Sequence, residues 1–252
     1  MANLSEIDLF LETTLQVQKI ADYAPNGVQV RGKEEISSLI TGVSACQELF
    51  ECAVERQAQL ILVHHGLFWE KDPRIIEGSL KQRLKILLTH DITLMAYHLP
   101  LDCHPEFGNN ICILKGLQLV PSAPFGLYRG IPLSFIGVLQ QALSLDDFLK
   151  RVQKLFGGDP LVLPYGPAWI KRVAVCSGGA PELLREAKRA GADLFLSGEA
   201  SEPLYYFARE EGIHMVAAGH HRTEKFGVET LGNLLAVKFG LQHQFIDLEN
   251  PL

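Results

Sequence analysis

Short apolar runs alternate with segments of helical periodicity along most of the chain, and this alternation sets the fold class. The pattern predicts strands over residues 37–43, 60–63 and 93–97, separated by helices over 47–57 and 80–89. Because parallel strands need crossover connections, a strand–helix–strand order of this kind predicts a parallel sheet. A chain of 252 residues is long enough to bury a sizeable core on such a sheet.

The second half of the chain repeats the scheme. We therefore expect an α/β protein with two similar lobes, the first over 1–125 and the second over 126–252. The stretch 121–167 is richer in Pro and Gly and is interpreted as the connection between them, without room for a large inserted domain. The elements predicted in the second lobe are strands over 172–176, 193–196, 214–218 and 243–248 and helices over 181–190, 202–211 and 223–239.

Composition narrows the class of protein. Hydrophobic residues make up 47% of the chain and charged residues 21%, as in soluble globular proteins, which excludes a disordered or collagen-like chain. The net charge of −6 argues against general nucleic-acid binding. No apolar run reaches the length of a membrane span, and the acidic N-terminus is typical of an amphipathic helix rather than a signal peptide. Five Cys without a C-x-x-C pair favour free thiols in the cytoplasm.

The standard nucleotide-binding loops, G-x-x-x-x-G-K-[ST] and G-x-G-x-x-G, do not occur in the chain. The turn Ser177–Gly179 follows a predicted strand and could bind an anion. A plain strand-to-helix turn is the favoured interpretation of these residues.

Six of the nine His fall in three short clusters that follow predicted strands. The first cluster is His64-His65, at the end of a buried apolar run. Ligands of open α/β sheets lie beyond the carboxyl ends of the strands, and neutral imidazole is the commonest metal ligand. Adjacent strand residues point to opposite faces, so both His reach one site only if the strand ends there and the chain turns at Gly66. The alternative is a pair of His that merely cap the strand and bond to neighbours.

The second cluster holds His98 and Asp102. Pro100 lies between them and predicts an extended or turned path, so we do not expect a helical i, i+4 pair. Asp102 is an oxygen donor that can bridge two cations. The alternative is a loop in which Asp102 is solvated or caps a nearby turn.

The third cluster holds His220 and Glu224, four residues apart at the start of a predicted long helix. They share one face if the helical turn begins early, and converge from a loop if Thr223 is the N-cap. An acid in the first turn of a helix is also stabilised by the helix dipole alone.

Taken together, the three clusters predict a site for two metal ions. Sheet topology brings adjacent strand ends close together, and a dinuclear centre is a common hydrolytic device. The ligand types allow two divalent transition-metal ions, Zn, Mn, Fe, Co or Ni, without choosing among them. Glu199, after another strand, is a candidate partner of a ligand or a proton carrier, or else an acid at a helix start. The five donors are His64, His65, Asp102, His220 and Glu224.

Five segments of the chain resemble the YbgI family, whose members are also called GTP cyclohydrolase I type 2 homologues or Nif-three-like proteins. The resemblance runs from residue 21 to about residue 227, and the chain is similar to the short bacterial form of the family. The segments are ADYAPNGVQV (21–30), LVHHG (62–66), AYHLPLDCHPEFGNN (96–110), SGEAS (197–201) and GHHRTEKFG (219–227).

The resemblance implies two interlinked α/β lobes with mainly parallel or mixed sheets, a di-metal site between them, and assembly of the homo-oligomer into a toroidal hexamer. Carried over position by position, it assigns the same five donors as metal ligands. His98 would line the site as a less certain ligand. Cys103 stands where a small inert residue is expected, and a filler role is favoured over ligation or oxidation.

The function implied is that of a metal-dependent hydrolase resembling GTP cyclohydrolase I type 2, in which metal-bound hydroxide attacks a nucleotide or related small molecule. His98 and Glu199 would shuttle protons as the catalytic residues. Phe68, Trp69 or Tyr97 could stack on a base, or lie in the core. The alternative function is a non-catalytic metal-binding scaffold or a metal-delivery protein. We expect no membrane partner and no nucleic acid.

Overall fold

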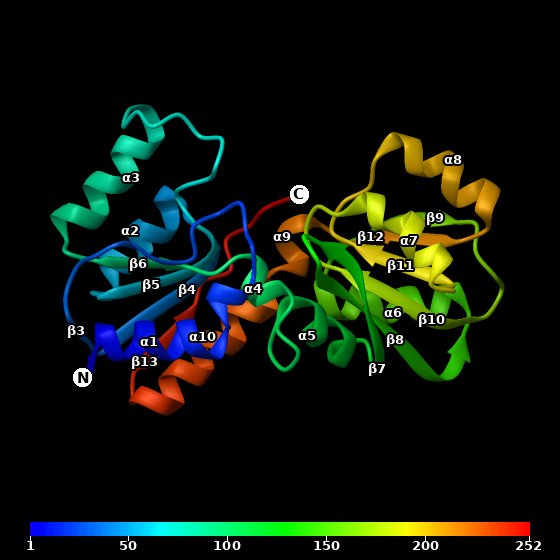
Figure 1. Ribbon diagram of the computed structural model, residues 1–252, viewed down its shortest axis with the longest axis horizontal. Coiled ribbons are helices and arrows are strands. Elements are labelled where there is room, and N and C mark those ends of the chain that lie inside the picture. The colour runs from blue at the N-terminus through cyan, green and yellow to red at the C-terminus, as the bar shows by residue number, and fades with distance from the viewer. The chain divides into compact units, whose positions relative to one another are not determined.

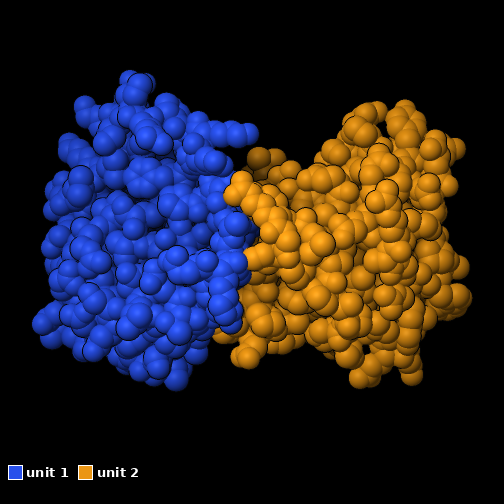
Figure 2. Space-filling model, viewed as in Figure 1, with its two compact units in different colours: residues 1–101, 227–249 blue, residues 102–226, 250–252 orange.

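A computed structural model describes all residues from 1 to 252, and its contacts divide the chain into two compact units. The first unit comprises residues 1–101 and 227–249, and the second comprises 102–226 and 250–252 (Figure 2). The predicted boundary at residues 125 and 126 lies inside the second unit. The backbone passes from one unit to the other three times.

The first unit is built on a five-stranded sheet with the strand order β13-β4-β5-β6-β2 (Figure 1). All neighbouring pairs are parallel except β2 with β6. The strands are β2 (Gly27–Val30), β4 (Ser38–Ser44), β5 (Leu60–His65), β6 (Thr93–Ala96) and β13 (Gln242–Phe245), with a separate pair β1 (Ala2–Asn3) and β3 (Glu35–Ile36). The helices are α1 (Leu4–Thr14), a 3-10 turn (Val17–Lys19), α2 (Gln47–Glu55), α3 (Gly78–Thr89) and most of α10 (Lys225–Phe239).

The central strands of this sheet are continuous apolar runs because helices cover the sheet on both faces. Figure 1 shows α2 and α3 on one face and α1 and α10 on the other. Ile61 and Val63 of β5 pack with Leu49 and Phe50 of α2 and with Leu87 of α3 in one buried cluster. The predicted order strand, helix, strand, helix, strand over 37–97 is therefore confirmed.

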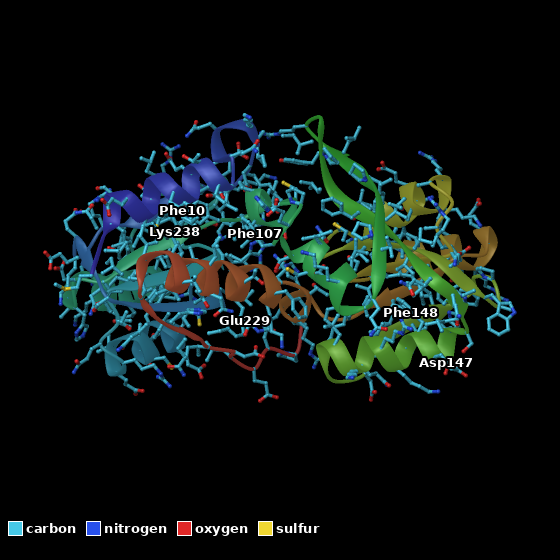
Figure 3. All side chains as sticks on the ribbon, turned by 90° about the horizontal axis from the view of Figure 1, so that it is seen from below. Phe10, Phe107, Asp147, Phe148, Glu229 and Lys238 are labelled. Atoms are coloured by element: carbon cyan, nitrogen blue, oxygen red, sulfur yellow. The ribbon has the colours of Figure 1, made fainter.

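The N-terminal helix α1 is amphipathic, as predicted. Asn3 caps it by accepting a hydrogen bond from the Ser5 amide. Its outer side contacts the end of α10, where the ammonium of Lys238 lies 4.6 Å from the ring centre of Phe10 (Figure 3). Phe239 adds an edge-on contact to the same ring.

The second unit is built on a six-stranded mixed sheet with the order β7-β8-β10-β11-β12-β9. The middle strands β10, β11 and β12 are parallel, and the outer strands are antiparallel to their neighbours. The strands are β7 (Leu119–Tyr128), β8 (Ile131–Leu143), β9 (Leu161–Pro164), β10 (Ile170–Cys176), β11 (Leu194–Ser197) and β12 (His214–Ala217). The helices are α5 (Asn109–Gly116), α6 (Leu145–Phe156), a 3-10 turn (Pro181–Leu183), α7 (Leu184–Arg189), α8 (Glu202–Glu211) and α9 (His220–Thr223).

Strand β10 shows how helices cover both faces of this sheet. Val173 and Val175 pack into a cluster with α5 and α6, whereas Ala174 and Cys176 pack into a second cluster with α7 and α8. Phe148 of α6 is buried in the first cluster, while its neighbour Asp147 is exposed (Figure 3). None of the helices in either unit combines the length and the apolar character that crossing a membrane requires.

Two expectations about the fold are corrected. The stretch 121–167 is not a plain connection, because β7, β8 and β9 belong to the second sheet itself. Pro is tolerated in β7 and β9 because both lie at sheet edges, where a missing amide hydrogen breaks no ladder. The last strand, β13, does not complete the second lobe, because it pairs with β4 in the first unit.

Candidate metal centre

In the first unit, His64 and His65 are the last two residues of β5, and His98 lies just beyond the end of β6. The strand does not end before His64, contrary to the expectation from the sequence. The ring centroid of His64 lies 4.7 Å from the ring centroid of His65 and 5.0 Å from that of His98. One ligand nitrogen from each of the three rings lies within 4.8 Å of the others. The carboxyl ends of adjacent parallel strands thus gather three imidazoles.

Hydrogen bonds to the Nδ1 atoms determine which ring nitrogens can bind a metal. Nδ1 of His64 lies 3.0 Å from the carbonyl oxygen of Tyr97 and must donate, because a carbonyl only accepts. Nδ1 of His65 lies 3.2 Å from the hydroxyl of Ser44. Nε2 of His64 therefore carries the lone pair of that ring, whereas the Ser44 hydroxyl, which can donate or accept, orients the His65 ring without fixing its tautomer.

His98 is held by a carboxylate that sequence reasoning did not single out. Its Nδ1 lies 2.9 Å from Oδ1 of Asp22, whose side chain is only 3% exposed. Burial by itself raises the pKa of Asp22, but hydrogen bonds and the charge of His98 outweigh it and lower the pKa to about 2. Asp22 is therefore ionised and can only accept, which fixes Nδ1 of His98 as the protonated nitrogen.

In the second unit, Asp102 lies at the end of a short helix, α4 (Leu99–Asp102). Pro100 sits in the first turn of this helix, where no backbone amide is needed, so of the extended or turned path expected there the chain takes the turned one. Oδ1 of Asp102 is buried and accepts hydrogen bonds from Asn109 at 2.9 Å and Ser177 at 3.0 Å. These bonds hold the carboxylate in one orientation.

His220 and Glu224 share one helical turn, because α9 begins directly after Gly219 and Thr223 is not an N-cap. Nε2 of His220 lies 3.2 Å from Oε2 of Glu224, and Nδ1 lies 2.5 Å from Oε1 of Glu199. The hydrogen bond to Glu224 raises the pKa of His220 to about 9, against the opposing effect of burial, and Glu199 adds to the rise.

Two further observations concern the carboxylates of the second unit. A carboxylate oxygen of Asp102 and one of Glu224 lie within 4.8 Å of each other. Gly178 packs against Glu224 in a left-handed conformation (φ +63°), so that a side chain at this position would collide with the Glu224 carboxylate. The turn Ser177–Gly179 connects β10 to the helical residues that begin at Pro181, as the favoured interpretation had it, and it also contacts both carboxylates.

The aromatic candidates differ in their surroundings. Tyr97 is fully buried, so it does not present its ring to a ligand. Phe68 and Trp69 line a cavity in the first unit.

Sequence reasoning missed Asp22 and Asn109, and it noted Ser177 and Gly178 without predicting their contacts with Asp102 and Glu224. Asp22 and Asn109 lie in segments already noted for their family resemblance, but neither is in a ligand-type cluster. The Gly-Gly pair after β10 was a signal for close backbone approach, which the collision at Gly178 explains.

The family model for Duf34/NIF3 (NGG1p interacting factor 3) matches residues 2–251. The chain belongs to this family. Among its curated relatives, the chain is similar to "GTP cyclohydrolase 1 type 2 homolog" proteins of Pasteurella multocida and Pseudomonas aeruginosa. The first is 43% identical over 99% of both chains, and the second is 42% identical over 98% of this chain and 96% of the relative.

Solved structures of Duf34/NIF3-like proteins show the same fold. The protein ybgI, described as of unknown function, is 38% identical with a TM-score of 0.95, and the match covers 99% of this chain and 100% of that one. A Thermus thermophilus protein is 35% identical with a TM-score of 0.90 over the same shares of the two chains. The expected α/β fold with parallel and mixed sheets is confirmed.

Proposed function

We propose that this Duf34/NIF3 protein binds two divalent transition-metal ions and acts as a metal-dependent hydrolase. The observation that carries the proposal is an oxygen contact at Nδ1 that three imidazoles share. Nδ1 of His64, His65 and His220 each lies within hydrogen-bond distance of an oxygen atom, which orients the ring and supports Nε2 as the atom that would bind a metal. Metal-binding histidines in proteins are held in this way by a second hydrogen bond.

The carboxylates support the same proposal. Asp102 and Glu224 are both buried, and their oxygens lie close together. Two buried carboxylates repel each other, and a bound cation offsets both that repulsion and the cost of desolvation. Three imidazoles and two carboxylates match the ligand preferences of Zn, Mn, Fe, Co and Ni. We assign His64, His65, Asp102, His220 and Glu224 as the ligands.

The rest of the proposed mechanism concerns protons. Two such ions, when bound, supply Lewis-acid activation of water near neutral pH. Nδ1–H of His98 donates a hydrogen bond to Asp22, so Nε2 is the nitrogen that would accept a proton and release it again during the reaction. Glu199 accepts from Nδ1 of His220 and is half-exposed, so it can pass a proton on to solvent.

The substrate class follows from the relatives. These relatives are named GTP cyclohydrolase 1 type 2 homolog, so a nucleotide is the first substrate to test. We further propose a homo-oligomer, a toroidal hexamer, in the cytoplasm, where the five thiols stay reduced. Sedimentation analysis of the purified protein tests the oligomer directly.

Metal analysis tests the proposed centre. The purified protein, reconstituted and desalted, should retain two equivalents of transition metal per chain. The double variant His65→Ala with Asp102→Ala should lose most of it. His90→Ala, which removes an exposed imidazole at the end of α3, is the matched control and should retain both equivalents. Unchanged metal content in the double variant would overturn the ligand assignment.

A turnover assay distinguishes the hydrolase from a non-catalytic metal-binding protein. Loaded protein should release formate from GTP or hydrolyse another nucleotide in a panel, and His64→Ala and Glu224→Ala should abolish that activity with folding intact. Two bound metals without turnover of any substrate would favour the metal-binding scaffold or metal-delivery protein.

A further inference from the structure

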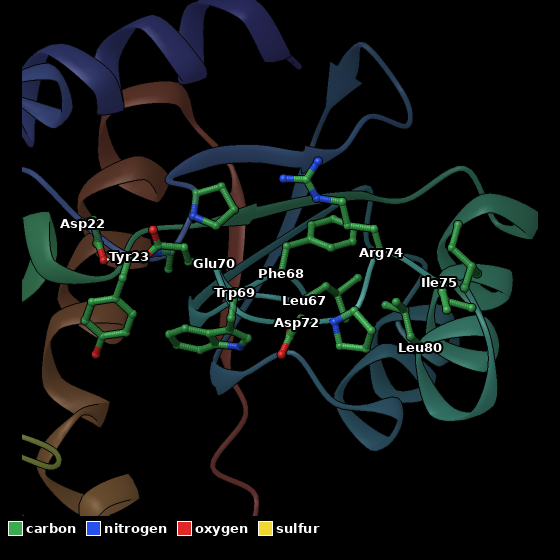
Figure 4. A pocket seen from close by; sticks show the side chains of 14 residues that line it. Asp22, Tyr23, Leu67, Phe68, Trp69, Glu70, Asp72, Arg74, Ile75 and Leu80 are labelled. Carbon is green, nitrogen blue, oxygen red and sulfur yellow. Dashed lines mark hydrogen bonds between the residues drawn. The ribbon is translucent and has the colours of Figure 1, made fainter.

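The first unit contains a cavity of about 680 Å³ beside the loop that follows β5 (Figure 4). Its volume lies within the range of sites that bind small organic molecules. The loop is held to the segment before β2 by a 3.0 Å hydrogen bond from the Glu70 amide to the Tyr23 carbonyl. Its aromatic and aliphatic lining includes Tyr23, Leu67, Phe68, Trp69, Ile75 and Leu80.

Two aromatic rings form one wall of the cavity. The centroids of Tyr23 and Trp69 lie 5.9 Å apart with 30° between the ring planes. A third ring inserted between them would need two van der Waals gaps, about 7 Å in all, so it does not fit there. A planar ligand would instead extend the stack from the cavity side. Tyr23 is 41% exposed and so presents ring surface to such a ligand.

The charged groups of the lining indicate the chemistry of the ligand. The carboxylate of Asp22 is not available to a ligand, because it already accepts hydrogen bonds from His98, from the amides of Ala24 and Leu99, and from Asn26. The charges left for a ligand are Glu70, Asp72 and Arg74, two negative and one positive. Carboxylates accept hydrogen bonds from N–H groups and repel phosphate. This lining favours a ring that carries amino groups and no negative charge.

The cavity adjoins the histidines of the first unit. Trp69 contacts His98 edge-on, with centroids 5.3 Å apart, and lies 5.7 Å from His65. Tyr23 also contacts His98, at 5.0 Å. A ring bound against this wall would therefore lie one side chain away from the imidazoles.

We propose that this cavity binds an amino-substituted heteroaromatic ring, neutral or cationic, stacked on the Tyr23–Trp69 wall. That the ring belongs to the substrate rests on the proposed hydrolase function, whereas its binding needs residues of the first unit alone. Any phosphate attached to the ring lies outside the cavity, away from Glu70 and Asp72.

Tryptophan fluorescence tests the proposal without any turnover. The chain has two Trp, and Trp169 is 66% exposed in the second unit, so Trp169→Phe leaves Trp69 as the only indole. The probes are two nucleoside pairs that differ only by an amino group, adenosine with purine riboside and guanosine with inosine. The amino member of at least one pair should quench saturably with at least threefold higher affinity. Its 5′-monophosphate should bind no more tightly.

Variants localise the binding. In the Trp169→Phe background, Tyr23→Leu should weaken the preferred nucleoside at least fivefold. Glu70→Gln with Asp72→Asn, two exposed positions that leave the fold intact, should reduce the amino preference to less than 1.5-fold. Tyr206→Leu, an exposed tyrosine of α8, is the matched control and should change nothing.

Titrations of both metal-free and metal-loaded protein separate this proposal from the hydrolase. Absent quenching in both forms, or equal affinity within both nucleoside pairs, would overturn the ring site while leaving the metal assignment untouched. Saturable binding by a protein that retains no metal would support the ring site and contradict the proposed metal centre instead.

Discussion

Nδ1 of His98 lies 2.9 Å from Oδ1 of Asp22, although the two residues are 76 positions apart in the chain. The contact is reinforced by neighbours, because Asp22 also accepts from the Leu99 amide and the His98 amide donates to Asn26. Side chain and backbone of His98 are thus both anchored to the segment before β2. The pair orients an imidazole beside His64 and His65 and provides the first prediction.

Asp22→Asn should lower the free energy of unfolding, and the loss should be largest above pH 4. The folded pKa of Asp22, about 2, lies below its ordinary value of 3.8, so its ionised form stabilises the fold above pH 3.8 and this contribution is lost as the pH falls through about 2. We expect a contribution on the order of 1–2 kcal/mol after solvent screening. Denaturant unfolding at pH 6, 4 and 2.5 measures it.

The difference between wild type and Asp22→Asn should therefore shrink toward pH 2. Asp146→Asn, an exposed acid of α6, is the control and should change stability little at any pH. A difference that stays constant from pH 6 to pH 2.5 would contradict the assignment of Asp22 as the ionised partner.

His220 in metal-free protein should titrate near pH 9. Its protonated form is stabilised chiefly by Glu224, so this contribution to stability is complete below pH 6.5 and is lost as the pH rises through about 9. NMR titration of the imidazole in protein stripped with a chelator measures the midpoint. Glu224→Gln should shift it toward 6.5, whereas Glu202→Gln, an exposed acid of α8, should not. An unchanged midpoint in Glu224→Gln would contradict the explanation that Glu224 raises the pKa of His220.

Gly178→Ala should reduce both stability and metal content. The new methyl group would occupy a left-handed backbone position and collide with the carboxylate of Glu224. We expect a loss of about 1–3 kcal/mol and weakened metal retention. Gly130→Ala isolates the backbone cost, because Gly130 also has positive φ (+86°) but open space around it. It should lose only about 1 kcal/mol and keep its metal. Equal metal content in the two variants would argue that the placement of the Glu224 carboxylate does not affect metal binding.

Cys176 should resist thiol reagents in the native protein. Burial raises its pKa to about 12, so almost no thiolate forms at neutral pH. The other four Cys are half-buried. A chromogenic thiol assay should therefore count at most four thiols before unfolding and five after it. In Cys176→Ala the native count should be unchanged and the unfolded count should be four. Rapid labelling of a fifth thiol in folded wild type would contradict this.

The strands and crossover helices were predictable because their signals are local. The runs that became β4, β5 and β6 are apolar on both faces, and α2 and α3 carry helical periodicity between them. The partner of β13 was not predictable, because nothing in residues 242–245 encodes pairing with a strand 200 positions earlier. The stretch 121–167 was misassigned because Pro and Gly usually mark connections, whereas Pro121, Pro124 and Pro164 lie within the edge strands β7 and β9.

The candidate site was predictable to the extent that strand ends carry unusual residues. His64, His65, His98 and His220 stood out by type and position alone. Asp22 did not, because a single carboxylate in a loop has no distinguishing pattern until folding brings it to His98. The roles of Ser177 and Asn109 were not predictable for the same reason, since only tertiary structure shows that they hold Asp102.

The threefold passage of the backbone between units has a consequence for synthesis on the ribosome. Apart from three C-terminal residues, the second unit is a continuous stretch, 102–226, whereas the first needs both the N-terminal 101 residues and 227–249. A nascent chain can thus assemble its second sheet while the first still lacks β13 beside β4 and the α10 helix. The unit whose translation begins first therefore cannot complete its sheet until β13 has been synthesised.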